Sequence, residues 1–356
     1  MSTRHITTYV QAHVVNDLLT LESYIRLRGG IMNNKFNIHT DLAVETKERF
    51  KGDNVEISGV EVYENVDDLH KVKLTKVEIT SLEGAKIMGK PMGKYVTIEA
   101  LDILENEVDG KRKNQIGKVL ARELYYMLPV RKKEELKSLS VLVVGLGNKD
   151  VTPDALGPYV VANLEVTRHI FMLKHNYGKS KGISAMIPGV MAQSGMESAE
   201  MVEGIVAKIK PDVVIAVDAL AAGSSKRLNS TIQLADTGIN PGSGIGNRRR
   251  GLNKETVGVP VIAIGIPTVI HAATIVRDTM EQMLDVLSKL PNVKENAGFE
   301  TLKSFDENER MKFVMEIMDE RFVNMFVTPK DIDESIQFMA ETVAYGINLL
   351  FSLSHR

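Results

Sequence analysis

Apolar and polar positions alternate along the first part of the chain and give way to longer apolar runs in the second part. Between Thr40 and Ala100, patterns such as Lys94-Tyr-Val-Thr-Ile-Glu99 place apolar residues at every second position. This alternation is typical of antiparallel strands that have one face buried and one face in solvent. The pattern therefore predicts a strand-rich region that packs beside a larger core.

From Leu139 onward, apolar runs alternate with helical patterns, which is typical of right-handed crossovers between parallel strands. The predicted strands are Ser140–Gly145, Ile183–Ile187, Val213–Val217, Thr231–Ala235 and Val259–Ile266. The predicted helices are Lys113–Leu128, Asp154–Leu173, Met196–Ile209, Thr268–Leu290 and Lys330–Leu350. The mostly polar stretch Pro291–Glu309 predicts a surface loop. The expected fold class is α/β, with a mainly parallel central sheet flanked by helices.

Composition limits the class of protein. A chain of 356 residues with 44% hydrophobic positions can bury a sizeable core in one large or two modest domains. A net charge of -2 gives no reason to expect binding to nucleic acid or to an acidic membrane. The absence of Cys excludes thiolate nucleophiles and disulfides, and no apolar run approaches the ~20 residues that cross a bilayer. These features predict a soluble, cytoplasmic protein.

Two aspartates stand where predicted strands end. Asp154 follows the strand Ser140–Gly145 through a short polar loop and opens a predicted helix, and Asp218 directly follows the run Val213–Val217. Because the carboxyl ends of parallel strands form one edge of a sheet, we expect the two carboxylates to meet there. Such a pair can hold one proton and act as acid and base together. Alternatively, each acid serves only a helix start or a turn.

The glycines of Gly145-Leu-Gly147 suggest a phosphate-binding turn, because glycines after a first strand let a phosphate approach a helix start. The match is poor, since the third glycine of the dinucleotide pattern is not at the required spacing. Asp154 would also repel a pyrophosphate at that helix end. We therefore expect no nucleotide and no other cofactor.

A glycine-rich stretch at 241–247 is followed by Arg248, Arg249 and Arg250, whose guanidinium groups suit recognition of carboxylates or phosphates. These arginines are candidate substrate contacts, and a solvated loop is the alternative interpretation. His271, at the start of a predicted helix, could complete a metal site with the two aspartates or simply make a polar contact there. HExxH does not occur in the sequence, and its one GxSxG match, at 178–182, precedes a predicted strand and so is not the strand-to-helix elbow of a serine hydrolase. Zinc-protease and serine-hydrolase assignments therefore lack their markers.

Longer segments carry a resemblance to a known family. In chain order they are HTDLAVETKERF (39–50), VGLGNKDVTPDALGP (144–158), VTRHIF (166–171), PGVM (188–191), KPDVVIAVDALAA (210–222), DTGINPGSGIGNRR (236–249), GVPVIAIGIPTV (258–269) and VTPKDID (327–333). VTPDALGP and PGSGIGN are far more specific than any single glycine pattern. On these segments the chain resembles the germination proteases of spore-forming bacteria, the endopeptidases that degrade α/β-type small acid-soluble spore proteins.

The resemblance implies a sheet like that of the hydrogenase-maturation peptidases, with a smaller strand-rich part. A single peptidase domain would span 42–356, with the strand-rich part at about 42–138, the catalytic core at about 139–290 and a helical part at about 310–356. The two aspartates proposed as catalytic in the family match Asp154 and Asp218. One would take a proton from the attacking water while the other protonates or polarises the peptide carbonyl.

The resemblance also implies an inactive precursor that removes its own N-terminal segment. The preferred cut of the family follows an acidic residue and precedes a hydrophobic residue and alanine, as in Asp41-Leu42-Ala43. Self-cleavage is thus predicted between Asp41 and Leu42, with residues 1–41 as extension and prosegment. An acid three residues before the scissile acid is also favoured in the family, whereas Ile38 stands there in this chain.

Spore proteins as substrates, a homotetramer and a location in the cytoplasm of the forespore and spore core are further implications of the resemblance. Two alternatives from other classes stay open. One is a metal-dependent peptidase that uses Asp154, Asp218 and His271, and the other is a non-catalytic binding module that uses the loop around Arg248.

Overall fold

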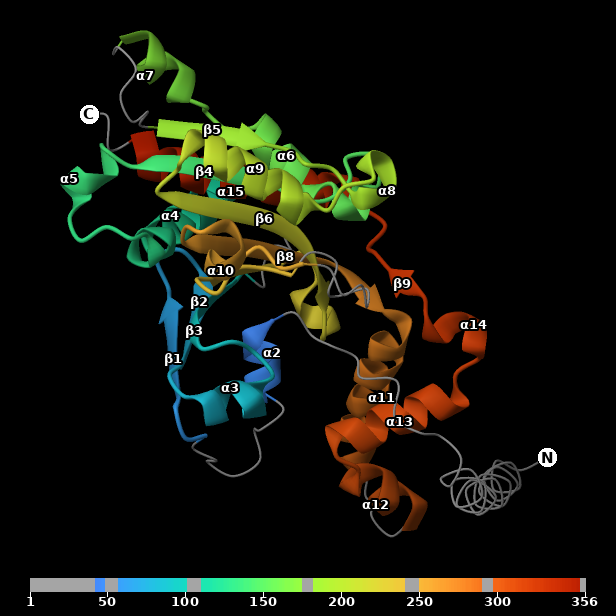
Figure 1. The fold of residues 1–356 in the computed structure, drawn as a ribbon. Helices are drawn as coiled ribbons and strands as arrows, with labels where there is room; N and C mark the ends of the chain where they lie inside the picture. The colour runs from blue at the N-terminus through green and yellow to red at the C-terminus, as the bar shows by residue number, and fades with distance from the viewer. Residues whose placement is uncertain are drawn as a thin grey trace. The chain divides into compact units, whose positions relative to one another are not determined.

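The computed structural model describes residues 42–48, 57–100, 110–174, 182–240, 250–289 and 297–352 (Figure 1). The chain divides into two compact units. Of the described residues, the larger comprises those within 39–274 and 324–356, and the smaller comprises those within 275–323. Both candidate catalytic aspartates belong to the larger unit.

A nine-stranded sheet forms the centre of the larger unit, in the order β1-β2-β3-β7-β8-β6-β4-β5, with β9 paired to β8. The strands are β1 Val60–Asp67, β2 Val72–Ile79, β3 Gly93–Glu99, β4 Ser140–Gly145, β5 Gly182–Met186, β6 Val213–Ala222, β7 Thr231–Ala235, β8 Val261–His271 and β9 Phe326–Val327. The neighbours among β5, β4, β6 and β8 are parallel, and all other described pairs are antiparallel. The α/β fold class is confirmed, and the sheet is mixed. Its antiparallel strands β1–β3 continue the same sheet through the β3–β7 pair.

The described residues also form helices of varied length. They are α2 Ala43–Glu48, α3 Leu82–Met88, α4 Gly110–Met127, α5 Lys133–Leu136, α6 Leu156–Ala162, α7 Arg168–Lys174, α8 Met191–Ser194, α9 Ser198–Ile209, α10 Lys254–Val257, α11 Ala272–Ser288, α12 Ala297–Ser304, α13 Glu307–Ile317, α14 Glu320–Val323 and α15 Ile332–Ser352, with the 3₁₀ helices η2 Thr152–Asp154 and η3 Ser225–Arg227. Among the described helices, none has both the length and the apolar character that crossing a bilayer requires.

The predicted strands Ser140–Gly145 and Thr231–Ala235 are confirmed to the residue. The predicted single helix Asp154–Leu173 is wrong, because this stretch forms η2, α6 and α7 in succession. Thr167 explains the second interruption: its N–H donates to Ile183 O (2.9 Å), and its Oγ1 accepts the Ile183 N–H (3.0 Å). These bonds tie the chain to the start of β5, and a continuous helix could not make them.

The predicted surface loop Pro291–Glu309 is also wrong in part, since the structure places α12 within it and begins α13 at Glu307. Asp306 caps α13 by accepting the Glu309 N–H on Oδ1 (2.8 Å), while Glu309 Oε2 accepts the Asp306 N–H (2.9 Å). This reciprocal pair satisfies two donors that a helix start would otherwise leave open. The polar residues of this stretch therefore start a helix.

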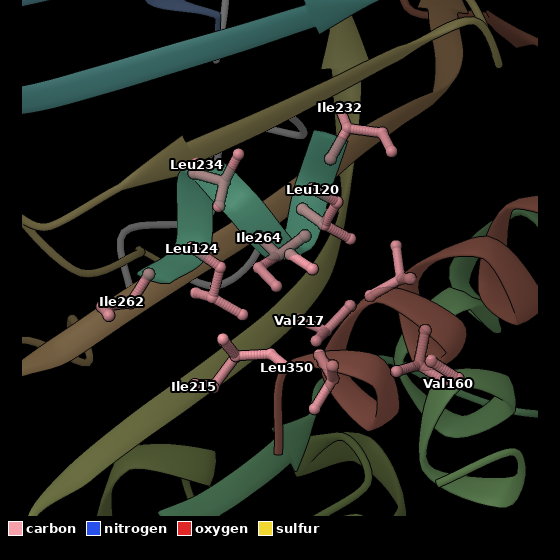
Figure 2. Close-up of a cluster of buried hydrophobic side chains, with 14 of the residues drawn as sticks. Leu120, Leu124, Val160, Ile215, Val217, Ile232, Leu234, Ile262, Ile264 and Leu350 are labelled. Carbon is pink, nitrogen blue, oxygen red and sulfur yellow. The ribbon is translucent and has the colours of Figure 1, made fainter. Parts of the chain in front are cut away.

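The first face of the sheet, defined here as the one that carries Ile215 and Val217, is covered by α4, α6 and α15. Figure 2 shows Leu124 of α4 and Leu350 of α15 beside side chains of β6, β7 and β8. Successive side chains of a strand point to opposite faces, so the second face carries the alternate residues, among them Asp218 of β6. That face is covered by α9 and α10 over β4 and β6, and by α2 and α3 over β2 and β3.

Candidate active site

The loop after β4 holds Asp154 in a fixed position. Leu146 N–H donates to Val217 O (2.8 Å), so the loop first continues along β6. Asn148 N–H then donates both to Asp154 Oδ2 (2.9 Å) and to Asp154 O (3.1 Å). Thr268 Oγ1 of β8 donates to Pro153 O (2.6 Å), which ties η2 to a third strand. The Asp154 carboxylate is thus oriented by its own loop and by the sheet edge.

Glycines allow this loop to fold back tightly. Gly147 has a φ of 106°, in the region that favours glycine, and a Cβ there would overlap Asp154 O. Cβ atoms at Gly145 and Gly157 would likewise overlap the backbone of the facing segment. The glycines that could suggest a phosphate site therefore serve the close approach of the segments before and after Asp154.

Asp218 lies within β6 and is 6% exposed. Its Oδ1 accepts the Ala219 N–H at 3.0 Å. The last residue of β4, Gly145, pairs with Val217, so Asp218 is the first residue of β6 beyond that parallel pairing. Asp218 and the loop that carries Asp154 therefore both lie where β4 ends against β6. The predicted strand end at Val217 is wrong, because β6 continues through Asp218 to Ala222 in its pairing with β8.

One register row of the second face continues from Asp218 across two strands. Asp218 pairs with Gly265 of β8, and Gly265 pairs with Gln233 of β7. Gly265 itself carries no side chain, and the Leu220 side chain occupies the space over it, because a Cβ at Gly265 would overlap Leu220. Gln233 is 7% exposed, and its position in an otherwise ordinary strand pattern did not mark it as a site residue.

The segment Leu42–Thr46 is buried on this same face. Leu42, Ala43 and Val44 are each 0% exposed. Leu42 and Val44 form a small apolar cluster with Leu220, whereas Ala43 joins the cluster that covers β2 and β3. Ala43 N–H donates to Gln233 Oε1 at 2.6 Å. The segment that would follow the predicted cut is therefore docked on the row that carries Asp218.

Tyr95 belongs to the wall around Ala43. Its hydroxyl donates to Pro91 O (2.8 Å) and accepts from Thr237 Oγ1 (3.3 Å). Burial raises the pKa of Tyr95 to about 12, so the phenol is neutral at physiological pH.

A buried group of charges holds the other end of the docked segment. Glu45 Oε2 accepts the Gly223 N–H at 2.8 Å, directly after β6, and Glu45 Oε1 lies 3.6 Å from Arg227. Arg227 Nε also donates to Glu99 Oε1 at 2.9 Å. All three charged side chains are less than 9% exposed. The sequence shows only one hint of this group, the acid that follows the apolar run Leu42–Val44.

The remaining predicted residues have separate places. Asp41, Arg248 and Arg249 lie outside the described residues. Arg250 pairs with Glu203 of α9 (2.8 Å). His271 ends β8, and its ring centroid lies 4.1 Å from that of Phe326. Among the described residues, the structure does not gather three His, Asp or Glu side chains into a metal-ligand group, so Asp154, Asp218 and His271 do not form one.

Known proteins resemble this chain over most of its length. A family model described as germination protease matches residues 38–298. The germination protease of Caldanaerobacter subterraneus subsp. tengcongensis is 43% identical over 314 residues, covering 88% of this chain and 93% of the relative. That of Bacillus subtilis strain 168 is 40% identical over 353 residues, with the same two coverages.

Among solved structures, the [NiFe] hydrogenase maturation protease HycI from Thermococcus kodakarensis KOD1 is 22% identical with a TM-score of 0.24, covering 38% of this chain and 79% of that one. This likeness is too low to support an inference. The family and its relatives agree, and this chain belongs to the germination protease family and is a peptidase.

Proposed function

We propose that this peptidase is made as an inactive precursor, cleaves itself between Asp41 and Leu42, and then degrades α/β-type small acid-soluble spore proteins during germination. The observation that carries the proposal is the burial of Leu42 in one cluster with Leu220, two residues beyond Asp218 on the same face of β6. Two residues of a strand span about 6.6 Å. The residue after the predicted scissile bond therefore lies close to a proposed catalytic carboxylate.

In the proposed reaction, Asp154 and Asp218 share the proton transfers of peptide hydrolysis. One carboxylate accepts a proton from the attacking water, while the other, in its protonated form, donates to the peptide carbonyl. Their roles exchange as the tetrahedral intermediate collapses, so that the leaving amine gains a proton. The backbone donors Asn148 N–H and Ala219 N–H orient the two carboxylates for these steps.

The proposal extends to the parts and partners of the protein. Residues 1–41 are removed as extension and prosegment, and residues 42–356 are retained as the peptidase. Arg248, Arg249 and Arg250 are proposed contacts for acidic residues of the substrate. We further propose that the protein forms a homotetramer and is located in the spore core.

Digestion of a purified α/β-type spore protein tests this function. The processed enzyme is expected to cut after an acidic residue and before a hydrophobic residue followed by alanine, with unchanged rate in a strong chelator. Asp154→Asn and Asp218→Asn variants should not cut. Loss of activity in chelator that added metal restores would favour the metal-dependent alternative, and failure to cut any spore protein would favour a binding module.

A further inference from the structure

We propose that Gln233 and the buried pair Glu45–Arg227 are positioning residues that set the register of the chain for self-cleavage. This proposal rests on the proposed cut between Asp41 and Leu42. It assigns a role to three side chains that do not take part in the proton transfers.

Gln233 fixes the backbone beside the predicted scissile bond. Its Oε1 accepts the N–H of Ala43. This N–H belongs to the Leu42–Ala43 peptide bond, which directly follows the predicted scissile bond. Gln233 and Asp218 lie on one register row, two inter-strand spacings or about 9.6 Å apart at Cα, with Gly265 between them and the Leu220 side chain over Gly265. A glutamine at this place can therefore hold the Ala43 amide on the row that carries Asp218.

Glu45 fixes the same segment two residues after Ala43. Its two carboxylate oxygens face the Gly223 N–H and the Arg227 guanidinium, and Glu99 holds Arg227 from the other side. Removing one partner of a buried ion pair leaves an uncompensated charge, so this contact admits little displacement. A shift of the segment by one residue would place Thr46 or Val44 at Arg227.

The two contacts together select one peptide bond. With Ala43 on Gln233 and Glu45 on Arg227, Leu42 and Val44 both lie in the cluster of Leu220, and Leu42 is the one that follows the predicted scissile bond. Glu45 is also an acid, but Gly223 and Arg227 bind its side chain. We infer that this contact keeps the Glu45–Thr46 peptide bond away from the proposed catalytic residues. The docking site therefore sets which acidic residue precedes the cut.

The test is self-cleavage of the full chain, with the rate and the new N-terminus measured together. Gln233→Leu removes the acceptor, whereas Gln233→Glu keeps an oxygen acceptor for the Ala43 N–H. We expect Gln233→Leu to slow cleavage at Leu42 by about five- to tenfold, as loss of one hydrogen bond would, and Gln233→Glu to lie within about threefold of wild type. Glu45→Gln should slow the cut by about tenfold and add minor N-termini at neighbouring residues.

Matched controls are Glu61→Gln on β1 and Gln337→Leu on α15, both at exposed positions, and each should cleave as wild type. Thermal unfolding of every variant identifies loss of fold, and a purely structural role would slow cleavage only in proportion to lost stability, without new termini. If Gln233→Leu and Glu45→Gln both cleave at the wild-type rate to a single new N-terminus, while Asp218→Asn stays uncut, the inference is wrong and the proposed function is unaffected. If the wild type never yields Leu42 as a new N-terminus, both this inference and the proposed self-cleavage are contradicted.

Discussion

The two faces of the central sheet differ in what they bury. The first face packs aliphatic side chains of β6, β7 and β8 against α4 and α15 (Figure 2). The second face buries Asp218, Gln233, Glu99 and Arg227 as well as apolar groups. Burying polar and charged groups costs free energy unless they are paired. The proposed function assigns the groups of the second face to the reaction and the apolar packing of the first face to stability.

The largest effect is expected from the two aspartates of the site. Asp154→Asn and Asp218→Asn should each lower cleavage of a peptide with the sequence of residues 38–48 by about 10²- to 10⁴-fold, because each removes one proton-transfer group. Stability should change little, since an asparagine Oδ1 can still accept the same backbone N–H. Peptide cleavage and thermal unfolding measured on the same samples check this separation. A loss of peptide cleavage that is fully explained by a loss of folded protein would contradict the different roles given to the two faces.

A substitution on the first face should show the reverse. Leu124 of α4 is fully buried, and Leu124→Ala should lower the free energy of unfolding by about 2–5 kcal/mol through lost burial and the cavity left behind. The folded fraction should keep its activity in the peptide assay. Denaturant titration gives the free energy, and activity loss in well-folded samples would show that the first face also shapes the site.

Gly147→Ala should sharpen the comparison, because Gly147 lies in the loop that holds Asp154. A Cβ there would overlap Asp154 O, and the positive φ disfavours any side chain. We expect a loss of stability of about 1–3 kcal/mol together with displacement of Asp154 and loss of most activity. Gly204→Ala, where a Cβ meets open space on α9, is the matched control and should leave activity unchanged while stability stays equal or rises by up to about 1 kcal/mol, because alanine favours a helix. A fully active Gly147→Ala enzyme would contradict the role given to this loop.

The smallest effect is expected at Tyr95. Its pKa is raised from 10.0 to about 12 by burial, so the neutral phenol contributes stability that is fully present below pH 10 and is lost as the pH rises towards 12. Tyr95→Phe loses a hydrogen bond to Pro91, about 1 kcal/mol at neutral pH. The variant should also lose less stability than wild type between pH 10 and 12. Parallel pH curves for the two proteins would contradict this assignment.

Sequence reasoning reached the parts of the molecule that local patterns specify. The apolar runs of β4 and β7 have the predicted bounds, and Asp154 and Asp218 lie where β4 ends against β6, as strand order implies. The interruption at Thr167 could not be predicted, because it depends on a pairing with Ile183 of another segment.

The sequence did not predict the polar residues of the second face that hold the segment Leu42–Thr46, for the same physical reason. Glu45, Glu99, Arg227 and Gln233 come from four separate segments, and each is ordinary in its own local pattern. Only the fold brings them together. The available signals were weak, namely a polar residue after the run Leu42–Val44 and another within the strand Thr231–Ala235.

The most direct test of the account is the N-terminus that appears when the full chain is incubated under mildly acidic, dehydrating conditions. The account predicts a single new terminus at Leu42 in the wild type, and no processing in Asp154→Asn or Asp218→Asn. A wild type that never exposes Leu42, or variants of both aspartates that process normally, would contradict it.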